Sequence, residues 1–420
     1  MKPCSISRFS LQYAHIIFCE RNKIMKKLIS FVLALLLVTL PLSPYTLAEP
    51  VNKVNLSRMT DSDIAGTGYT YTAETHTLTV IASGLSFYGT GENVFIKINE
   101  NVKDITLSNA TLSGEGCGIG YYGESDTLTI NIDGINSIQA PSISSENALI
   151  TSKTSLFLKG IGTLTLSGVN SLFVEKGNLT IQDIKLIASD QVLNGLWVKD
   201  GDLMITDAQI KVVSKYASLF AGSFDSTTSN ACGGNITITD STIEAESCQY
   251  ASIVAFSESN GEEGNIFISG KARVKANGGI GDSGSEGIYA EGMLTLSLSD
   301  DGKLIANGGT GTTGYHDSYA CGINAKSISF AFTSLASPKN GKIITKTTGD
   351  TTFQLIAQAD GTIAQSLTAE PTIANETEDE DPAETVLPAD QVDWVLYTVM
   401  GVGGLLLFFV LLRIFLKNKE

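Results

Sequence analysis

The segment Leu172-Phe173-Val174 decides the fold, because triplets of the same kind return along most of the chain. Counted from Leu149, their first residues are separated by 23, 24, 23, 34, 35 and 35 positions. The triplets are Leu172-Phe173-Val174, Leu196-Trp197-Val198, Leu219-Phe220-Ala221, Ile253-Val254-Ala255, Ile288-Tyr289-Ala290 and Ile323-Asn324-Ala325. Similarity at a roughly fixed period is typical of a solenoid, in which each repeat is one structural unit.

Two further strands are expected in each repeat. The second reads apolar, mostly Thr, apolar, an alternation that turns its first and third side chains inward. Its copies are Leu164-Thr165-Leu166, Leu179-Thr180-Ile181, Leu203-Met204-Ile205, Ile236-Thr237-Ile238, Ile266-Phe267-Ile268 and Leu294-Thr295-Leu296. The third strand is expected to stack Ile184, Ile210, Ile243, Val274 and Leu304 on one side.

Three strands per repeat predict an all-β fold, a parallel β-helix whose coils bury their apolar faces on one another. A β-sandwich is the alternative, since its strands also recur at short intervals, but it gives no reason for three strand types to return in the same order. The longer later repeats contain glycine-rich segments at 278–284 and 308–314. Loops inserted on one side of a solenoid are common binding surfaces.

The composition of the 420-residue chain bounds the class of partner. Its 28 Lys and Arg against 44 Asp and Glu give a formal net charge of −16. Nucleic acid is therefore excluded as a partner, because it requires a basic footprint. The negative charge is compatible with calcium binding or with solubility outside a cell.

Residues 1–48 are expected to be a leader that contains a signal peptide. Met25-Lys26-Lys27 precedes an apolar run from Leu28 to Leu40, and Thr46-Leu47-Ala48 supplies small residues for cleavage after Ala48. Met25 is the expected true start, and residues 49–365 are the expected β-helix ectodomain.

The other end of the chain predicts a membrane anchor. An apolar run from Val395 to Leu412, with Trp394 and Tyr397 at its outer edge, lies within a predicted transmembrane helix at 392–416. Residues 366–391 are an expected acidic, disordered stalk, and 417–420 a cytoplasmic tail. We therefore expect a single-pass protein of the cell membrane with its large domain outside the cell.

Four cysteines remain after removal of the leader: Cys117, Cys232, Cys248 and Cys321. Their even number permits two disulfides. Their irregular spacing is equally compatible with free thiols buried in the stack.

No residue is assigned a catalytic role from the sequence. A glycoside hydrolase needs two facing carboxylates, for which Asp300-Asp301 and Asp240 with Glu244 are candidates. Both lie in turns, where Asp is favoured for backbone reasons alone.

Binding residues are expected on two surfaces. Aligning the third strands places Lys185, Lys211, Glu244 and Lys275 on successive coils, with Arg273 beside them. Such a ladder could follow an acidic polymer, or it could be a solvated face in which Glu244 bridges its neighbours. In the late loops, Tyr315, His316 and Tyr319 could contact a sugar.

The late loops also contain acidic residues that could hold calcium, the one cofactor we consider. Calcium takes several oxygen ligands from flexible loops, and Asp282, Glu286 and Asp317 are the candidates. The sequence lacks the spacing of an EF-hand or of a nonapeptide calcium repeat.

Two segments resemble a known group of proteins. Gly66-Thr67-Gly68-Tyr69-Thr70-Tyr71 leading to Thr77-Leu78-Thr79-Val80, and Gly287-Ile288-Tyr289-Ala290-Glu291-Gly292-Met293-Leu294-Thr295-Leu296, are similar to parts of β-helical surface proteins of clostridia. The resemblance covers roughly residues 66–335 and implies a pectate-lyase-like, right-handed parallel β-helix that binds carbohydrate without catalysis. It also implies a Gram-positive source and calcium held by acidic side chains, although no repeated Asp-rich loop is evident here.

The sequence therefore predicts a membrane-anchored, cell-surface polysaccharide-binding module, whose polymer could be acidic. A structural or adhesive surface repeat protein (an adhesin contacting proteins or cells) is the first alternative, and a polysaccharide lyase or hydrolase is the second.

Overall fold

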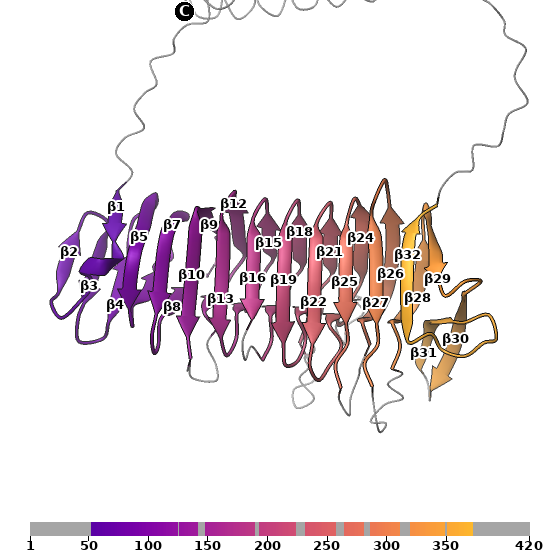
Figure 1. Cartoon of the computed structure of the whole chain (residues 1–420). Coiled ribbons are helices and arrows are strands. Elements are labelled where there is room, and N and C mark those ends of the chain that lie inside the picture. The colour runs from indigo at the N-terminus through magenta and orange to yellow at the C-terminus, as the bar shows by residue number, and fades with distance from the viewer. Residues whose placement is uncertain are drawn as a thin grey trace, which may run out of the picture. The chain divides into compact units, whose positions relative to one another are not determined.

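The computed structural model describes residues 52–372, apart from 125, 142–147, 190–192, 224–231, 258–263, 281–285, 311–319 and 349–350. The described residues form 32 strands and one short 3-10 helix, Leu56–Arg58. Most strands pair in parallel with the strand one coil away, so the coils follow one another in chain order (Figure 1). This arrangement confirms the predicted all-β, solenoid-like fold.

The strands lie on three faces, which we number in the order in which a coil passes through them. The first face begins with β4 (Thr77–Val80), β6 (Phe95–Ile98) and β8 (Gly118–Tyr121), each parallel to the next. It continues through β11 (Ile150–Ser152), β14 (Leu172–Val174), β17 (Leu196–Val198), β20 (Leu219–Ala221), β23 (Ile253–Ala255) and the first residues of β26 (Ile288–Leu298) and β28 (Ile323–Phe330).

The register of the first face confirms the predicted triplets. Leu172 pairs with Leu196, Leu196 with Leu219, and the pairing continues through Ile253, Ile288 and Ile323. One residue is corrected, because Ile150 and not Leu149 pairs with Leu172.

The second face holds the second strands of the coils. It begins with β1 (Lys53–Asn55) and the first parts of β5 (Leu85–Glu92) and β7 (Asp104–Ser113). It continues through β9 (Leu128–Asp133), β12 (Leu156–Gly160), β15 (Leu179–Gln182), β18 (Leu203–Thr206), β21 (Ile236–Thr239) and β24 (Ile266–Gly270), and ends on the later residues of β26 and β28.

The third face completes each coil. After the later parts of β5 and β7 it contains β10 (Ile135–Ala140), β13 (Thr163–Gly168), β16 (Lys185–Ser189), β19 (Gln209–Ser214), β22 (Thr242–Ser247), β25 (Arg273–Asn277) and β27 (Lys303–Asn307).

Two predictions of strand membership and register are wrong. Leu164-Thr165-Leu166 lies on the third face, where Leu164 pairs with Leu186, and Leu156 takes the expected place on the second face. Leu186, and not Ile184, pairs with Ile210. The same alternation of apolar and polar residues fits either face and either of two registers two residues apart, so the pattern alone does not choose.

One continuous core fills the inside of the three faces. Its side chains are the inward members of each alternation, such as Leu196, Leu219 and Ile253, each 0% exposed. Full burial of one such side chain contributes about 1.5–3 kcal/mol relative to exposure.

Both ends of the solenoid are closed by antiparallel strands. At the start, β2 (Ile64–Gly66) and β3 (Tyr69–Thr72) pair antiparallel and lead into β4. At the end, β32 (Ser366–Pro371) pairs with β27 and with β29 (Thr333–Ser337), and the hairpin of β30 (Lys342–Thr348) and β31 (Thr351–Ala357) pairs with β28. Covering an open sheet edge prevents pairing with other chains. Because residues 366–371 form β32, the folded unit extends into the segment where we expected the stalk to begin.

Polar residues set the turns between faces. Between the second and third faces, Asn109, Asp183, Asp207, Asp240 and Asp300 adopt φ values of 49–58°. Asn and Asp tolerate this left-handed conformation better than other side chains. Between the first and second faces, Asp202 Oδ1 accepts the Asn235 backbone N–H at 2.9 Å, and Asn235 Oδ1 accepts that of Asn265 at 2.9 Å. This ladder satisfies backbone groups that the turns would otherwise leave unpaired.

The predicted leader (1–48), most of the predicted stalk, the predicted membrane span (392–416) and the tail lie outside the described residues. Within residues 52–372, as far as the structure describes them, no helix is long and apolar enough to cross a membrane. The four cysteines in this part are free, but only Cys117 and Cys321 are buried as expected for thiols in the stack, whereas Cys232 is partly exposed and Cys248 is exposed.

Candidate functional site

The outer surface of the first face carries the most distinctive side chains among the described residues. The middle residue of each triplet points outward, because successive side chains of a strand alternate between its two sides. In register, these outward residues are Gly120, Thr151, Phe173, Trp197, Phe220, Val254, Tyr289 and Asn324. Aromatic rings are therefore brought together on one surface by the coil spacing.

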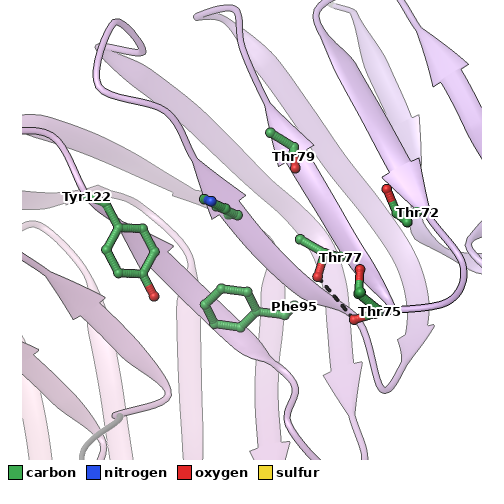
Figure 2. Close-up of a pocket in the computed structure, with 7 residues that line it drawn as sticks. Thr72, Thr75, Thr77, Thr79, Phe95 and Tyr122 are labelled. Atoms are coloured by element: carbon green, nitrogen blue, oxygen red, sulfur yellow. Dashed lines mark hydrogen bonds between the residues drawn. The ribbon is translucent and has the colours of Figure 1, made fainter.

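A hollow of about 500 Å³, which we call the first hollow, opens at the beginning of this face. Its lining consists of Thr72, Thr75, Thr77, Thr79, Phe95, Lys97 and Tyr122 (Figure 2). Thr77 and Thr79 come from β4, Phe95 and Lys97 from β6, and Tyr122 from the residue after β8. The Thr77 hydroxyl donates to the Thr75 carbonyl oxygen at 3.0 Å.

Gly120 determines how the two rings of the first hollow lie. A Cβ atom at this position would be 2.7 Å from Phe95 Cζ and 2.8 Å from Tyr122 Cε2. The rings therefore occupy the space that a side chain would fill, and lie over bare strand backbone. Tyr122 is 37% exposed, so part of its ring is accessible to a ligand.

A second hollow of about 320 Å³ lies at the turns from the first to the second face. Its lining is Glu124, Lys153, Thr154, Glu175, Lys176, Lys199, Asp200 and Cys232. The two hollows adjoin, because the Lys153 Nζ atom is 5.9 Å from the centroid of the Tyr122 ring.

Farther along the first face, aromatic rings pack on one another. Trp197 is 4.8 Å from Phe173 and 5.7 Å from Phe220, measured between ring centroids, and its indole N–H donates to the Gly222 carbonyl oxygen at 3.0 Å. The series continues from Phe220 to Phe256 at 5.5 Å. Each such pair contributes about 0.5–1.5 kcal/mol beyond area burial. Trp197 and Phe220 lie nearly parallel, at 11° between their planes, so these rings stabilise the stack by packing on one another, while Phe173 and Trp197 remain partly exposed.

A buried polar cluster follows the rings. Glu286 is only 3% exposed, and its Oε1 accepts a hydrogen bond from Asn324 Nδ2 at 3.2 Å. Burial, followed by the negative charge of Glu286, raises the pKa of Tyr250 to about 12. Burial is also the main cause that raises the pKa of Tyr289, with Glu291 next. Both phenols therefore remain protonated at neutral pH.

The predicted calcium ligands are only partly described. Glu286 lies in the buried cluster just described, whereas Asp282 and Asp317 lie outside the described residues. In the part of the chain that the structure describes, no three His, Cys, Asp or Glu side chains come together to hold a metal ion.

The predicted cation ladder of the third face is differently arranged than expected. Lys185 pairs in register with Gln209, so it is not aligned with Lys211, as a consequence of the two-residue register error. Lys211 and Lys275 do flank Glu244 on neighbouring strands, and Lys211 forms an ion pair with Glu244 at 3.1 Å. Arg273 forms an ion pair with Asp301. Exposed pairs of this kind contribute about 0–1 kcal/mol.

The remaining predicted binding residues, Tyr315, His316 and Tyr319, lie outside the described residues. The carboxylates considered as catalytic residues of a hydrolase have structural roles. Asp240 and Asp300 each adopt a φ of 49° in their turns, and Asp300 forms an ion pair with Lys271 at 3.2 Å.

Sequence reasoning missed both hollows of the first face. The residues of the first hollow are about 20 positions apart in sequence, and become neighbours only through the pairing of Thr77 with Phe95 and of Lys97 with Gly120. The sequence did contain a signal for the first hollow. Thr77 and Phe95 occupy outward positions of their strands, and Gly120 occupies the outward position of the strand that follows on the same face.

Comparisons with known proteins identify no relative of this chain. No family model matches it, no curated protein is significantly similar, and no solved structure matches its fold significantly.

Proposed function

We propose that this chain is a membrane-anchored cell-surface protein that binds polysaccharide without catalysis, and that the first hollow is a binding site. The observation that carries this proposal is the joining of threonine hydroxyls, two aromatic rings and one lysine in an open depression. The rings can pack on the apolar face of a sugar, and the hydroxyls and the ammonium group can form hydrogen bonds with its hydroxyl groups.

The openness of the hollow favours a polymer over a small molecule. Sites for small ligands usually enclose most of the ligand surface. The first hollow instead lies on the outside of a sheet that continues over many coils, and it adjoins the second hollow through Tyr122 and Lys153. A chain of sugars could therefore extend from one hollow into the next.

The sequence supports the remaining parts of this proposal. The predicted leader and the predicted span support a solenoid held outside a cell membrane, and the resemblance to clostridial surface proteins supports a Gram-positive source. A right-handed coil is the expected sense, because crossover connections between parallel strands are right-handed in about 98% of cases. Calcium, held by the late acidic loops, is the proposed cofactor for an acidic polymer.

The test is retention of the full-length protein in detergent micelles on a panel of neutral and acidic polysaccharides, with calcium and with chelator. On a polymer that retains the protein, we expect Lys97→Gln to weaken binding several-fold, because an ammonium donor of the first hollow is lost. Lys185→Gln is the matched control, an exposed lysine on the third face. A larger loss from Lys185→Gln would transfer the binding site to the third face.

A structural or adhesive role is the second candidate. It is favoured by the rings of the first face, which pack on one another and stabilise the stack. Retention on protein matrices or on cells, with none on any glycan, would support it. Release of unsaturated or reducing ends from a polymer would instead indicate a lyase or a hydrolase.

A further inference from the structure

The second hollow presents charges of both signs in a regular arrangement. Lys153, Glu175 and Lys199 each directly follow the last residue of a first-face strand, and these strands are paired in register. They therefore occupy equivalent positions on three successive coils, with the signs plus, minus, plus. At the next position, Lys176 and Asp200 carry the opposite signs of their neighbours.

These charges form no ion pair with one another in the part of the chain that the structure describes. Among the described residues, the ion pairs join Lys103 to Asp126, Lys211 to Glu244, Lys271 to Asp300, Arg273 to Asp301 and Lys303 to Glu370, and none includes a residue of the second hollow. On the third face Lys211 pairs with Glu244 across neighbouring coils, although Lys185 and Lys275 form no ion pair among the described residues. The second hollow differs in gathering three ammonium and three carboxylate groups in one place, where they are available to a ligand.

The balance of these charges favours one class of ligand. Without calcium to bridge the two, a polyanion would meet Glu124, Glu175 and Asp200 within the hollow, and would be repelled by a chain whose formal net charge is −16. A polymer with amino and acidic groups in similar numbers has no net charge to be repelled. It could also pair with ammonium and carboxylate groups at the coil spacing of about 4.8 Å.

We propose that the second hollow binds a zwitterionic glycan, one that carries both amino groups and carboxylate or phosphate groups. This inference rests on the proposed function and names the chemical class of the polymer. It assigns the second hollow to charge recognition and the first hollow to contact with the sugar rings.

The probe is dextran in four forms that share one backbone: unmodified, carboxymethylated, aminoethylated, and carrying both groups at equal density. Binding of the full-length protein is measured in detergent micelles at low salt. We expect the form with both groups to bind at least about tenfold more tightly than any other form. Tightest binding of the carboxymethylated form, or of the aminoethylated form, would overturn the inference.

Two sets of variants locate the effect. Lys153→Gln with Lys199→Gln, and Glu175→Gln with Asp200→Asn, remove charges of one sign each. Both sets are expected to weaken binding of the doubly modified dextran, and neither removes a buried side chain. A loss from the lysine variants alone would indicate an anion site, which contradicts the proposal.

Cys232 supplies a readout that does not depend on affinity. It lines the second hollow and is partly exposed, whereas Cys248 is exposed in the turn after β22. Bound doubly modified dextran should slow maleimide labelling of Cys232 several-fold and leave the labelling of Cys248 unchanged. Equal rates with and without the polymer would overturn the inference.

The inference and the proposed function can fail separately. Retention on a neutral glycan that depends on Lys97 but not on Lys153 or Glu175 would preserve the proposed function and reject the zwitterionic ligand. Binding of the doubly modified dextran at the second hollow, with no retention on any natural glycan, would reject the role of the first hollow alone.

Discussion

The outer surfaces of the first and third faces share the same alternation of side chains but use it differently. On the third face, outward positions such as Lys211 and Glu244 are exposed and pair with each other across neighbouring coils. On the first face, Phe220 and Val254 also point outward, yet they are 8% and 0% exposed and belong to a second apolar cluster. One solenoid thus has an outer surface that is solvated on one side, and packed and hollowed on another.

This difference, more than the distribution of charge, is the reason why we propose the first face as the binding surface. Charges that pair with each other, as Lys211 and Glu244 do, have little left to offer to a ligand, and such exposed pairs contribute little to stability. The first face, by contrast, has two hollows, one formed around Gly120 and its neighbouring rings and one lined by charges without ion pairs, in which a ligand can be bound. The predictions below separate the two faces by the size of the effect.

The largest effect is expected from Val254→Asp on the first face. This change places a carboxylate in the apolar cluster of Phe220 and Phe256, at a position that is 0% exposed. Burial of an unpaired charge should lower the free energy of unfolding by several kcal/mol. The measurement is the denaturation midpoint followed by circular dichroism. Thr242→Asp, at an exposed outward position of the third face, is the control and should change stability by less than about 0.5 kcal/mol.

Trp197→Ala should have the next largest effect. It removes ring contacts with Phe173 and Phe220, and the hydrogen bond to the Gly222 carbonyl oxygen. We expect a loss of about 3 kcal/mol in unfolding free energy, and a smaller loss for Trp197→Phe, which keeps a ring. Equal stability of the two variants would show that the stacked rings do not support the face.

Gly120→Ala tests the first hollow. The added Cβ atom would meet Phe95 and Tyr122 at 2.7 and 2.8 Å, so both rings must move. We expect a cost of about 1–3 kcal/mol together with weaker glycan binding. Thr151→Val, at the next outward position of the same row, should leave glycan binding intact. Unchanged binding by Gly120→Ala would remove the first hollow from the site.

The stability linked to the ionisation of Tyr250 changes only at alkaline pH. Its pKa in the folded protein, about 12, lies above its ordinary value of 10.0, so the unfolded chain loses the proton first as pH rises. The stability linked to this group is complete below pH 10 and is lost between pH 10 and pH 12. Two pKa units correspond to about 2.7 kcal/mol, which partial exposure reduces to about 1 kcal/mol. The unfolding free energy of Tyr250→Phe should therefore fall less steeply between pH 10 and pH 12 than that of the unaltered protein. An unchanged pH profile would contradict the assignment.

The smallest effect is expected from Lys211→Gln on the third face. The Lys211–Glu244 pair is exposed at both ends, so its loss should cost about 0–1 kcal/mol and less at high salt. A cost above about 2 kcal/mol would mean that the third face contributes more to the fold than solvated pairs do.

The fold could be predicted from the sequence to the level of strands but not of all registers. The triplets of the first face were placed correctly, because Leu172, Leu196 and Leu219 recur with matching neighbours. Leu164 and Ile184 were misplaced, because alternating Leu and Thr look the same on two faces and after a shift of two residues. The αL turns were visible as Asp and Asn, although their conformation was not.

The site could not be predicted, for a different physical reason. Thr77, Phe95 and Gly120 lie on three separate strands, and none of them is unusual in its own segment. The first hollow depends on Gly120, which has no side chain and leaves room for the rings of Phe95 and Tyr122. The late loops, on which the sequence placed Tyr315 and His316, lie outside the described residues.

The most direct test of the central claim compares two tyrosines of nearly equal exposure. Tyr122, in the first hollow, is 37% exposed, and Tyr88, on β5, is 38% exposed. The affinity of the full-length variants Tyr122→Ala and Tyr88→Ala is measured for the polysaccharide on which the unaltered protein is retained. Loss of one ring that stacks on a sugar corresponds to about 1–3 kcal/mol by analogy with base stacking, so Tyr122→Ala should weaken binding about tenfold or more while Tyr88→Ala changes nothing. Equal affinity of the two variants would contradict the assignment of polysaccharide binding to the first face.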